Sequence, residues 1–311
     1  MNNKKIRDGF EFTAIKYPFN LYDAIKITEE HEIEEYIKYI NKHSIEYAEI
    51  VMPNLEVLKY CPQLKYLNIR PSYNALQDFD FSPLYTLPEV YMLNCINEYG
   101  PQCQYVVPID YSRINGLKEL SFSVNTGTLN YHKIMNLKSL SVGDFKGSKG
   151  DLTDLFCSAE LDTLELRGCR ISSLDGIEKS KKIQCLYISY NQSLKDISAL
   201  GKVKRTLKAL RIENCSKIED FSVLEELENL ELLELTGKNQ LESLKFIKKM
   251  RRLKTFVFNM NILDGDLTPC LGLSYACSEK NRSHYNLKDK DLPKGEYVRG
   301  NEDIELWRRL E

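Results

Sequence analysis

The chain has 311 residues, of which 42% are hydrophobic and 28% charged, so it has enough apolar material for one large core or two ordinary ones. Lys and Arg total 43 against 45 Asp and Glu, which excludes a chain-wide attraction to nucleic acid or anionic membranes. The basic N-terminus lacks the apolar run of a signal peptide, and no apolar stretch is long enough to span a bilayer, so we expect a cytoplasmic protein.

The first predicted element is a helix over about residues 28–43. Thr28 and the glutamates that follow it favour a helix N-terminus, and Ile33, Ile37 and Ile40 continue as an apolar stripe. We assign residues 1–44 to an N-terminal cap, which would cover the exposed end of the repeats that follow.

One pattern recurs between residues 45 and 262. It consists of an apolar residue, two variable residues, an apolar residue, one variable residue, an apolar residue, two variable residues and then often Asn or Cys. Nine units follow it, and a degenerate earlier unit with Ile45, Ala48 and Ile50 brings the array to nine or ten. Their first residues, separated by 20 to 30 positions, are Leu64, Leu87, Leu117, Leu137, Leu161, Ile183, Leu207, Leu230 and Leu253.

Each unit predicts one short strand followed by a tight return. Side chains alternate along a strand, so the fourth and sixth positions point inward and the third, fifth and seventh point outward. A single unit cannot bury its apolar side, but neighbours stacked ~4.8 Å apart share a core and pair in parallel. In the second half of a unit, apolar residues three apart, such as Ile171, Leu174 and Ile177, predict a 3₁₀ or short helical segment.

These residues resemble the leucine-rich-repeat family over roughly positions 45–262. Units of about 22 residues with short return segments are similar in architecture to the bacterial internalin-like subclass. The resemblance implies an α/β solenoid: a leucine-rich-repeat horseshoe with parallel β-strands on its concave face, short 3₁₀ or helical segments on its convex side, and a cap at each end.

The outward strand positions define the predicted concave face. Tyrosine and arginine are enriched at protein interfaces, and the mixed charges argue against a nucleic-acid backbone, which would require a basic stripe. We therefore predict a protein partner, with no nucleic acid and no membrane involved. The candidate partner-binding residues are Tyr66, Asn68, Arg70, Glu89, Tyr91, Glu119, Glu165, Arg167, Tyr187, Arg211, Glu213 and Glu234.

Two further regions interrupt or end the array. An insertion over residues 96–116 contains Gly100, Pro101 and Tyr105, and it is either a contact loop or a tolerated surface loop. Residues 263–311 form the predicted C-terminal cap and tail. Their polar stretch 279–300 is expected to lie extended over the last repeat or to be partly disordered, and a short helix with Trp307 follows it.

Catalytic motifs are incomplete in this sequence. The run that begins at His31 lacks the second His of a zinc protease helix, and the glycine-rich stretch 143–150 lacks the Gly-Lys-Ser/Thr of a phosphate loop. The nine scattered cysteines suit reduced thiols. Cys95, Cys169 and Cys215 occupy the inward Asn/Cys position of the pattern, where a structural role is expected. We predict a non-enzymatic protein without a cofactor.

Three functions remain open at this point. The first is a scaffold that binds a cognate protein, for example a bacterial toxin-immunity protein. The second is a metal-dependent switch or enzyme that uses Cys270, Cys277 and His284. The third is a structural or assembly role. The identity of the partner and the oligomeric state are not determined by the sequence.

Overall fold

The computed structural model of the chain describes residues 5–17, 20–70, 79–95, 109–125, 127–155 and 158–297. The chain forms two compact units, which divide between Ser141 and Val142. In the described part of the chain, no helix combines the length and the apolar character needed to cross a membrane.

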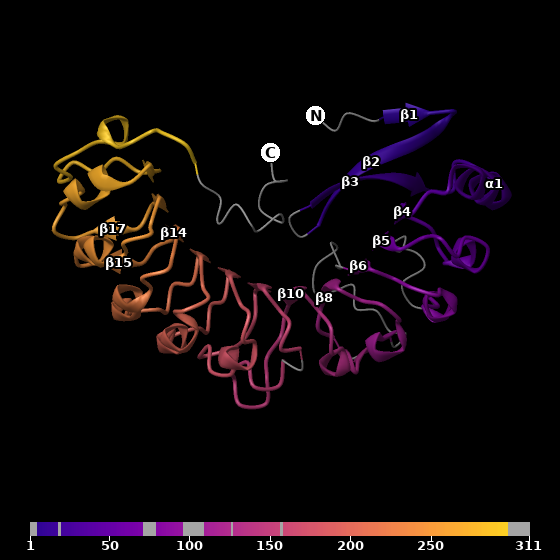
Figure 1. Ribbon diagram of the computed structural model, residues 1–311, viewed down its shortest axis with the longest axis horizontal. Coiled ribbons are helices and arrows are strands. Elements are labelled where there is room, and N and C mark those ends of the chain that lie inside the picture. Colours follow the sequence, from indigo (N-terminus) through magenta and orange to yellow (C-terminus); the bar gives the residue numbers. More distant parts are fainter. Residues whose placement is uncertain are drawn as a thin grey trace. The chain divides into compact units, whose positions relative to one another are not determined.

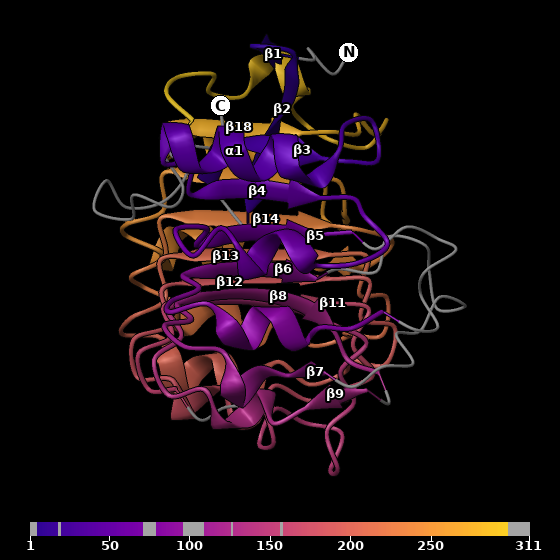
Figure 2. The same cartoon turned by 90° about the vertical axis from the view of Figure 1, so that its right-hand side faces the viewer.

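The first unit is a sheet that starts with antiparallel strands and continues with parallel ones (Figure 1). Its strand order is β1-β2-β3-β4-β5-β6-β8-β10, and Figure 2 shows β4, β5, β6 and β8 side by side. The strands are β1 (Lys5–Arg7), β2 (Phe10–Tyr17), β3 (Asn20–Ile27), β4 (Tyr47–Ile50), β5 (Tyr66–Ile69), β6 (Met92–Cys95), β8 (Glu119–Ser123) and β10 (Ser139–Gly143), with β7 (Ile109–Asp110) and β9 (Thr128–Leu129) as a separate pair.

The helix of the N-terminal region, α1 (Ile33–His43), begins later than the sequence predicted. The hydroxyl of Thr28 accepts a hydrogen bond from the backbone N–H of Glu30 at 3.2 Å, so Thr28 stabilises a turn and Glu32 precedes the helix. The strands β1 to β3 were not predicted either. Because β3 pairs in parallel with β4, the sheet extends further toward the N-terminus than the predicted array.

The second unit is an array of parallel strands in continuous register, with the order β11-β12-β13-β14-β16-β18. The strands are β11 (Thr163–Arg167), β12 (Cys185–Ser189), β13 (Ala209–Glu213), β14 (Leu232–Thr236), β16 (Thr255–Phe258) and β18 (Tyr275–Ser278), with β15 (Gln240–Leu241) and β17 (Asn261–Ile262) as a separate pair. β18 lies beyond residue 262, so the repeats also continue past the predicted C-terminal end of the array.

Short 3₁₀ segments connect the strands and lie on one side of them in each unit (Figure 1). The first unit contains Glu56–Lys59, Ser82–Thr86, Tyr111–Arg113 and Tyr131–Lys133. The second contains Ile177–Lys179, Ser198–Val203, Ser222–Glu226, Lys245–Lys249 and Thr268–Gly272, and one further segment, Asp289–Asp291, follows the last strand. The predicted return segments are therefore confirmed.

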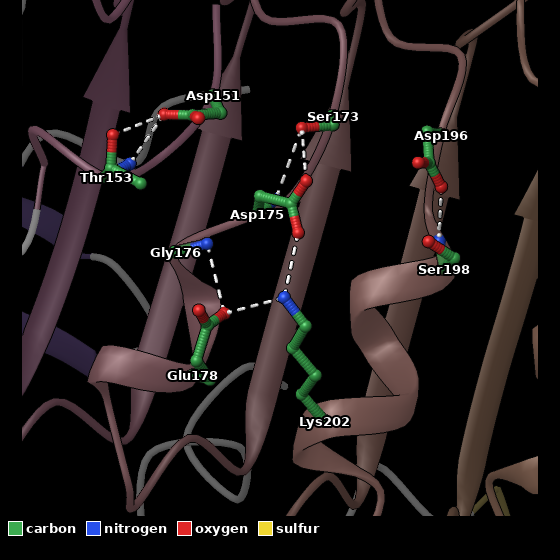
Figure 3. A network of polar contacts seen from close by, with 9 residues as sticks. All are labelled: Asp151, Thr153, Ser173, Asp175, Gly176, Glu178, Asp196, Ser198 and Lys202. Carbon is green, nitrogen blue, oxygen red and sulfur yellow. Dashed lines mark hydrogen bonds and ion pairs between the residues drawn. The ribbon is translucent and has the colours of Figure 1, made fainter. Parts of the chain in front are cut away.

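Aspartates two residues ahead of Ser or Thr set many of the turns that lead into the return segments (Figure 3). The Asp196 carboxylate accepts the backbone N–H of Ser198 at 2.8 Å, and Asp151 accepts that of Thr153 at 2.9 Å. Lys202 reaches back to the carboxylate of Asp175 at 2.8 Å. Asp is favoured in turns because its carboxylate can accept the backbone N–H of the residue two positions later.

The inward Asn and Cys side chains donate hydrogen bonds to backbone carbonyls, including those of the preceding repeat. The Asn191 side-chain amide is fully buried and donates to the carbonyls of Leu166 (2.9 Å) and Ser189 (3.1 Å). The Cys169 thiol is within 3.5 Å of the Val142 carbonyl, which it approaches as a weak donor. Buried carbonyls need partners, so the structural role predicted for this position holds for Cys169 and Asn191.

The repeat assigned to Leu87 is out of register by three residues. β6 pairs Met92 with Tyr66 on one side and with Glu119 on the other, so Val90 rather than Leu87 occupies the first position. Leu93 then points into the core, where it is fully buried, and Cys95 ends the strand instead of following it. Residues 96–108 of the predicted insertion 96–116 lie outside the described residues, as do Trp307 and the predicted C-terminal helix.

Candidate functional site on the open face of the sheet

The face of the strands that points away from the 3₁₀ segments is called the open face here, and the sequence predicted it as the concave face. In the second unit, strand pairing aligns Glu165, Tyr187, Arg211 and Glu234 in one row across β11 to β14. All four side chains are half-buried. Because each repeat contributes the same outward position, these positions form a continuous line of polar side chains.

Side-chain contacts join members of this row to one another and to Arg167 and Glu213, which lie two positions further along their strands. The Tyr187 hydroxyl donates a hydrogen bond to the Glu213 carboxylate on β13. Arg211 Nε lies 3.1 Å from Glu234 Oε2 on β14. Arg167 Nε lies 3.6 Å from Glu165 Oε1 within β11. Six of the predicted partner-binding residues therefore come together on one surface of the second unit.

Partial burial affects both the ion pair and the tyrosine of this surface. The side chains of Arg211 and Glu234 are only 19% and 21% exposed, so their attraction is screened less than that of a surface pair. Burial raises the pKa of Tyr187, and the Glu213 carboxylate raises it further. The phenol therefore stays protonated at neutral pH and remains a hydrogen-bond donor. Such a surface can recognise polar and charged side chains by complementary contacts.

The open face of the first unit carries a different arrangement, dominated by tyrosine rings. The rings of Tyr47 and Tyr66 stack with centroids 4.3 Å apart, and the ring of Tyr91 lies 5.3 Å from that of Tyr66. Burial, with the neighbouring Tyr47 second, raises the pKa of Tyr66 to about 12. Beside these rings, Arg70 Nε lies 3.1 Å from Glu49 Oε1. This surface combines tyrosine rings packed against one another with the Arg70–Glu49 ion pair.

Four residues predicted in the first unit do not occupy exposed positions of the strand rows. Asn68 and Glu119 are buried, and the Asn68 amide donates to Glu49 at 3.1 Å. Because of the shifted register, Glu89 lies before β6, where it faces Lys65 at 3.4 Å, and Tyr91 directly precedes the strand. Tyr66 and Arg70 lie on the open face as predicted.

Tyr47 and Tyr297 were not assigned to the open face from the sequence. Tyr47 occupies the outward third position of the degenerate unit that begins at Ile45, so the pattern itself could have indicated it. Tyr297 contacts Glu234 from the C-terminal segment. No periodic signal precedes Tyr297, since its segment belongs to no repeat.

The proposed metal group is not assembled. Cys270 is fully buried within the segment Thr268–Gly272, whereas Cys277 pairs with Val257 on the open face. His284 Nε2 contacts the carbonyl of Ile262 at 2.9 Å. Among the described residues, no group of three or more His, Cys, Asp or Glu side chains could hold a metal ion. The structure thus gives no support to a switch built on these three residues.

Comparison with solved structures relates this arrangement to a known architecture. The internalin InlF of Listeria monocytogenes superposes with a TM-score of 0.51 at 18% sequence identity, over 76% of this chain and 67% of the internalin. The fold is a leucine-rich-repeat solenoid. Its short repeats with 3₁₀ returns give it the internalin-like architecture that the sequence pattern resembled.

A second internalin, the functional domain of InlJ from Listeria monocytogenes, matches with a TM-score of 0.47 at 14% identity, over 73% of this chain and 52% of that domain. No protein-family model matches the sequence, and no curated protein is detectably similar to it. The leucine-rich-repeat fold explains how the site is built, because each repeat presents its outward residues beside those of the next.

Proposed function

We propose that this leucine-rich-repeat chain is a non-enzymatic scaffold that binds a protein partner on the open face of β11 to β14. The observation that carries the proposal is the row of Glu165, Tyr187, Arg211 and Glu234, in which tyrosine and arginine lie half-buried beside carboxylates. Tyrosine and arginine dominate the energetics of protein interfaces because they combine contact area with directed hydrogen bonds.

The charges of the row and of its neighbours Arg167 and Glu213 favour protein over nucleic acid. Three carboxylates, those of Glu165, Glu213 and Glu234, stand against the two guanidinium groups of Arg167 and Arg211. A phosphate backbone would be repelled by such a face, whereas a protein surface of mixed charge can complement it.

The finer version of the proposal is a cytoplasmic protein that neutralises one cognate partner, as a toxin-immunity protein does. Its support is the array of short repeats in the second unit, which presents a continuous line of polar side chains. The partner would be a folded protein with surface charges opposite to those of the row.

Charge reversal on the open face tests the proposal. The full-length protein is immobilised and used to capture partners from a lysate of its source organism, alongside Arg167→Glu and Arg211→Glu. Each substitution is expected to reduce capture of a specifically retained protein by roughly tenfold or more, the effect of losing an interface residue worth more than 1.4 kcal/mol.

Lys204→Glu is the matched control, because Lys204 is exposed and pairs with Glu226 on a return segment rather than on the open face. Denaturation curves establish that all variants are folded. Equal capture by the wild type and both arginine variants would contradict the proposed surface, and capture lost only in Lys204→Glu would place the contact on the other side.

A further inference from the structure

The C-terminal part of the described chain returns to the last strand of the second unit. The Ala276 N–H donates to the Pro293 carbonyl at 2.9 Å, the Gly295 N–H donates to the Ser274 carbonyl at 3.0 Å, and Lys294 forms an antiparallel bridge with Tyr275. We call residues 293–297 the strap. Its first three residues cover backbone groups that the edge strand β18 would otherwise expose.

Beyond this anchor the strap reaches inward over the open face. The Tyr297 hydroxyl donates to Glu234 Oε1 on β14, which is separated from β18 by β16 in the strand order. The Tyr297 ring lies edge-on to that of Tyr275, with centroids 5.1 Å apart. Arg211 Nε forms an ion pair with the other oxygen of Glu234 at 3.1 Å. Glu234 is thus shared between the row and the strap.

Edge protection does not account for the Tyr297 contact. The hydrogen bonds of residues 293–295 already engage the backbone of Ser274 and Ala276 at this edge, whereas Tyr297 contacts a side chain of the row itself. Its phenol supplies Glu234 with the kind of donor that a partner's tyrosine would bring.

We propose that the strap is a built-in occupant of the open face, which covers the site at Glu234 until a protein partner displaces Tyr297. The inference rests on the proposed function, since the covered residue belongs to the proposed binding row. A partner that reaches Glu234 must offer a side chain that donates a hydrogen bond in place of the phenol, as tyrosine does. Its apparent affinity is lowered in proportion to the fraction of molecules in which the strap is released.

Labelling of Cys277 with iodoacetamide tests the strap without any partner. Cys277 is half-buried on the open face, two residues from Tyr275, whereas Cys61, Cys95, Cys169, Cys185, Cys215 and Cys270 are buried. In the full-length protein, Tyr297→Ala is expected to raise the Cys277 labelling rate by roughly three- to tenfold, the range for losing one hydrogen bond and a ring contact. Tyr297→Phe keeps the ring and should give a smaller increase.

Glu296→Gln is the matched control, because Glu296 is an exposed neighbour within the strap, and it should leave the rate unchanged. Gly295→Ala is a second route to release, since an added Cβ would lie 2.8 Å from the Ser274 carbonyl oxygen. Mass spectrometry follows each cysteine separately, and unlabelled Cys270 confirms that the chain remains folded.

An unchanged Cys277 rate in both Tyr297→Ala and Gly295→Ala would overturn the strap proposal. So would a wild-type rate as fast as that of the denatured chain. Because this measurement requires no partner, its failure is distinct from a failure to capture one. With a captured partner in hand, Tyr297→Ala should bind it more tightly than the wild type by the same factor.

Discussion

Aspartate side chains shape many of the turns of this protein through local hydrogen bonds. In several repeats an aspartate carboxylate accepts hydrogen bonds from the hydroxyl and the backbone N–H of a Ser or Thr two residues later, and these hydrogen bonds lower the pKa of the aspartates. The carboxyls affected in this way are Asp80, Asp110, Asp196, Asp220 and Asp266. Because the same contact recurs along the array, the small effects of the individual aspartates on stability add up over the whole chain.

The lowered pKa values predict a loss of stability in acid. A carboxyl with a pKa below its ordinary value of 3.8 stabilises the fold above that value, and this stabilisation disappears as the pH falls through the folded-state pKa. We expect the double variant Asp196→Asn, Asp220→Asn to lose less stability than the wild type between about pH 5 and pH 3, because asparagine keeps an acceptor oxygen but does not titrate.

Urea denaturation midpoints at a series of pH values measure this difference. Asp→Asn leaves the turn hydrogen bond to Ser198 possible, so the variant should remain folded at neutral pH. Parallel curves of midpoint against pH for the two proteins would show that these aspartates do not contribute to the acid transition.

At the residue level, the sequence predicted the surface better in the second unit than in the first. Glu165, Tyr187 and Arg211 could be assigned because strict alternation in regular repeats fixes the side to which each one points. The burial of Glu119 and Asn68 could not be predicted, because strand alternation gives the direction of a side chain but not what covers it.

At the level of elements, the ambiguous repeat near Leu87 shows where pattern reasoning fails. Leu87, Val90 and Met92 satisfy the repeat, but Val90, Leu93 and Cys95 satisfy it equally well. The strand pairing selects the second set, because it places Leu93 beside Leu67 and Leu120 in the core. Hydrophobicity alone cannot decide between frames three residues apart when an insertion removes the regular spacing on one side.

Some return segments directly follow a residue of positive φ, a conformation that favours glycine. Gly176 has a φ of +97°, and a Cβ at this position would lie 2.7 Å from the Thr153 backbone nitrogen of the preceding repeat. We expect Gly176→Ala to lower the free energy of unfolding by about 2 kcal/mol or more, since strain and a backbone clash combine.

Gly272→Ala is the matched control for this substitution. Gly272 has no neighbour within 4 Å of an added Cβ, so its replacement should change the free energy of unfolding by less than about 0.5 kcal/mol. Denaturant titration of both variants gives the comparison. Similar effects at the two positions would mean that the tight contact between repeats at Gly176 does not limit stability.

For the whole molecule, the fold could be predicted because independent copies of one pattern support each other. A single unit such as Leu161, Leu164 and Leu166 would be ambiguous, but its neighbours at regular spacing require parallel stacking. The ends were predicted less well, because there the chain leaves the pattern: the strands before α1 and the contact of Tyr297 depend on tertiary pairing that no periodicity records.

The most direct test of the binding row compares two tyrosines of the same repeat. Tyr187 lies on the open face, and Tyr190 lies just past the end of β12 with 55% of its surface exposed. A photo-crosslinking amino acid is placed at each position in turn, and a captured partner is irradiated in complex with each variant. We predict a covalent complex from position 187 and little or none from position 190. Equal or stronger crosslinking from position 190 would contradict binding on the open face.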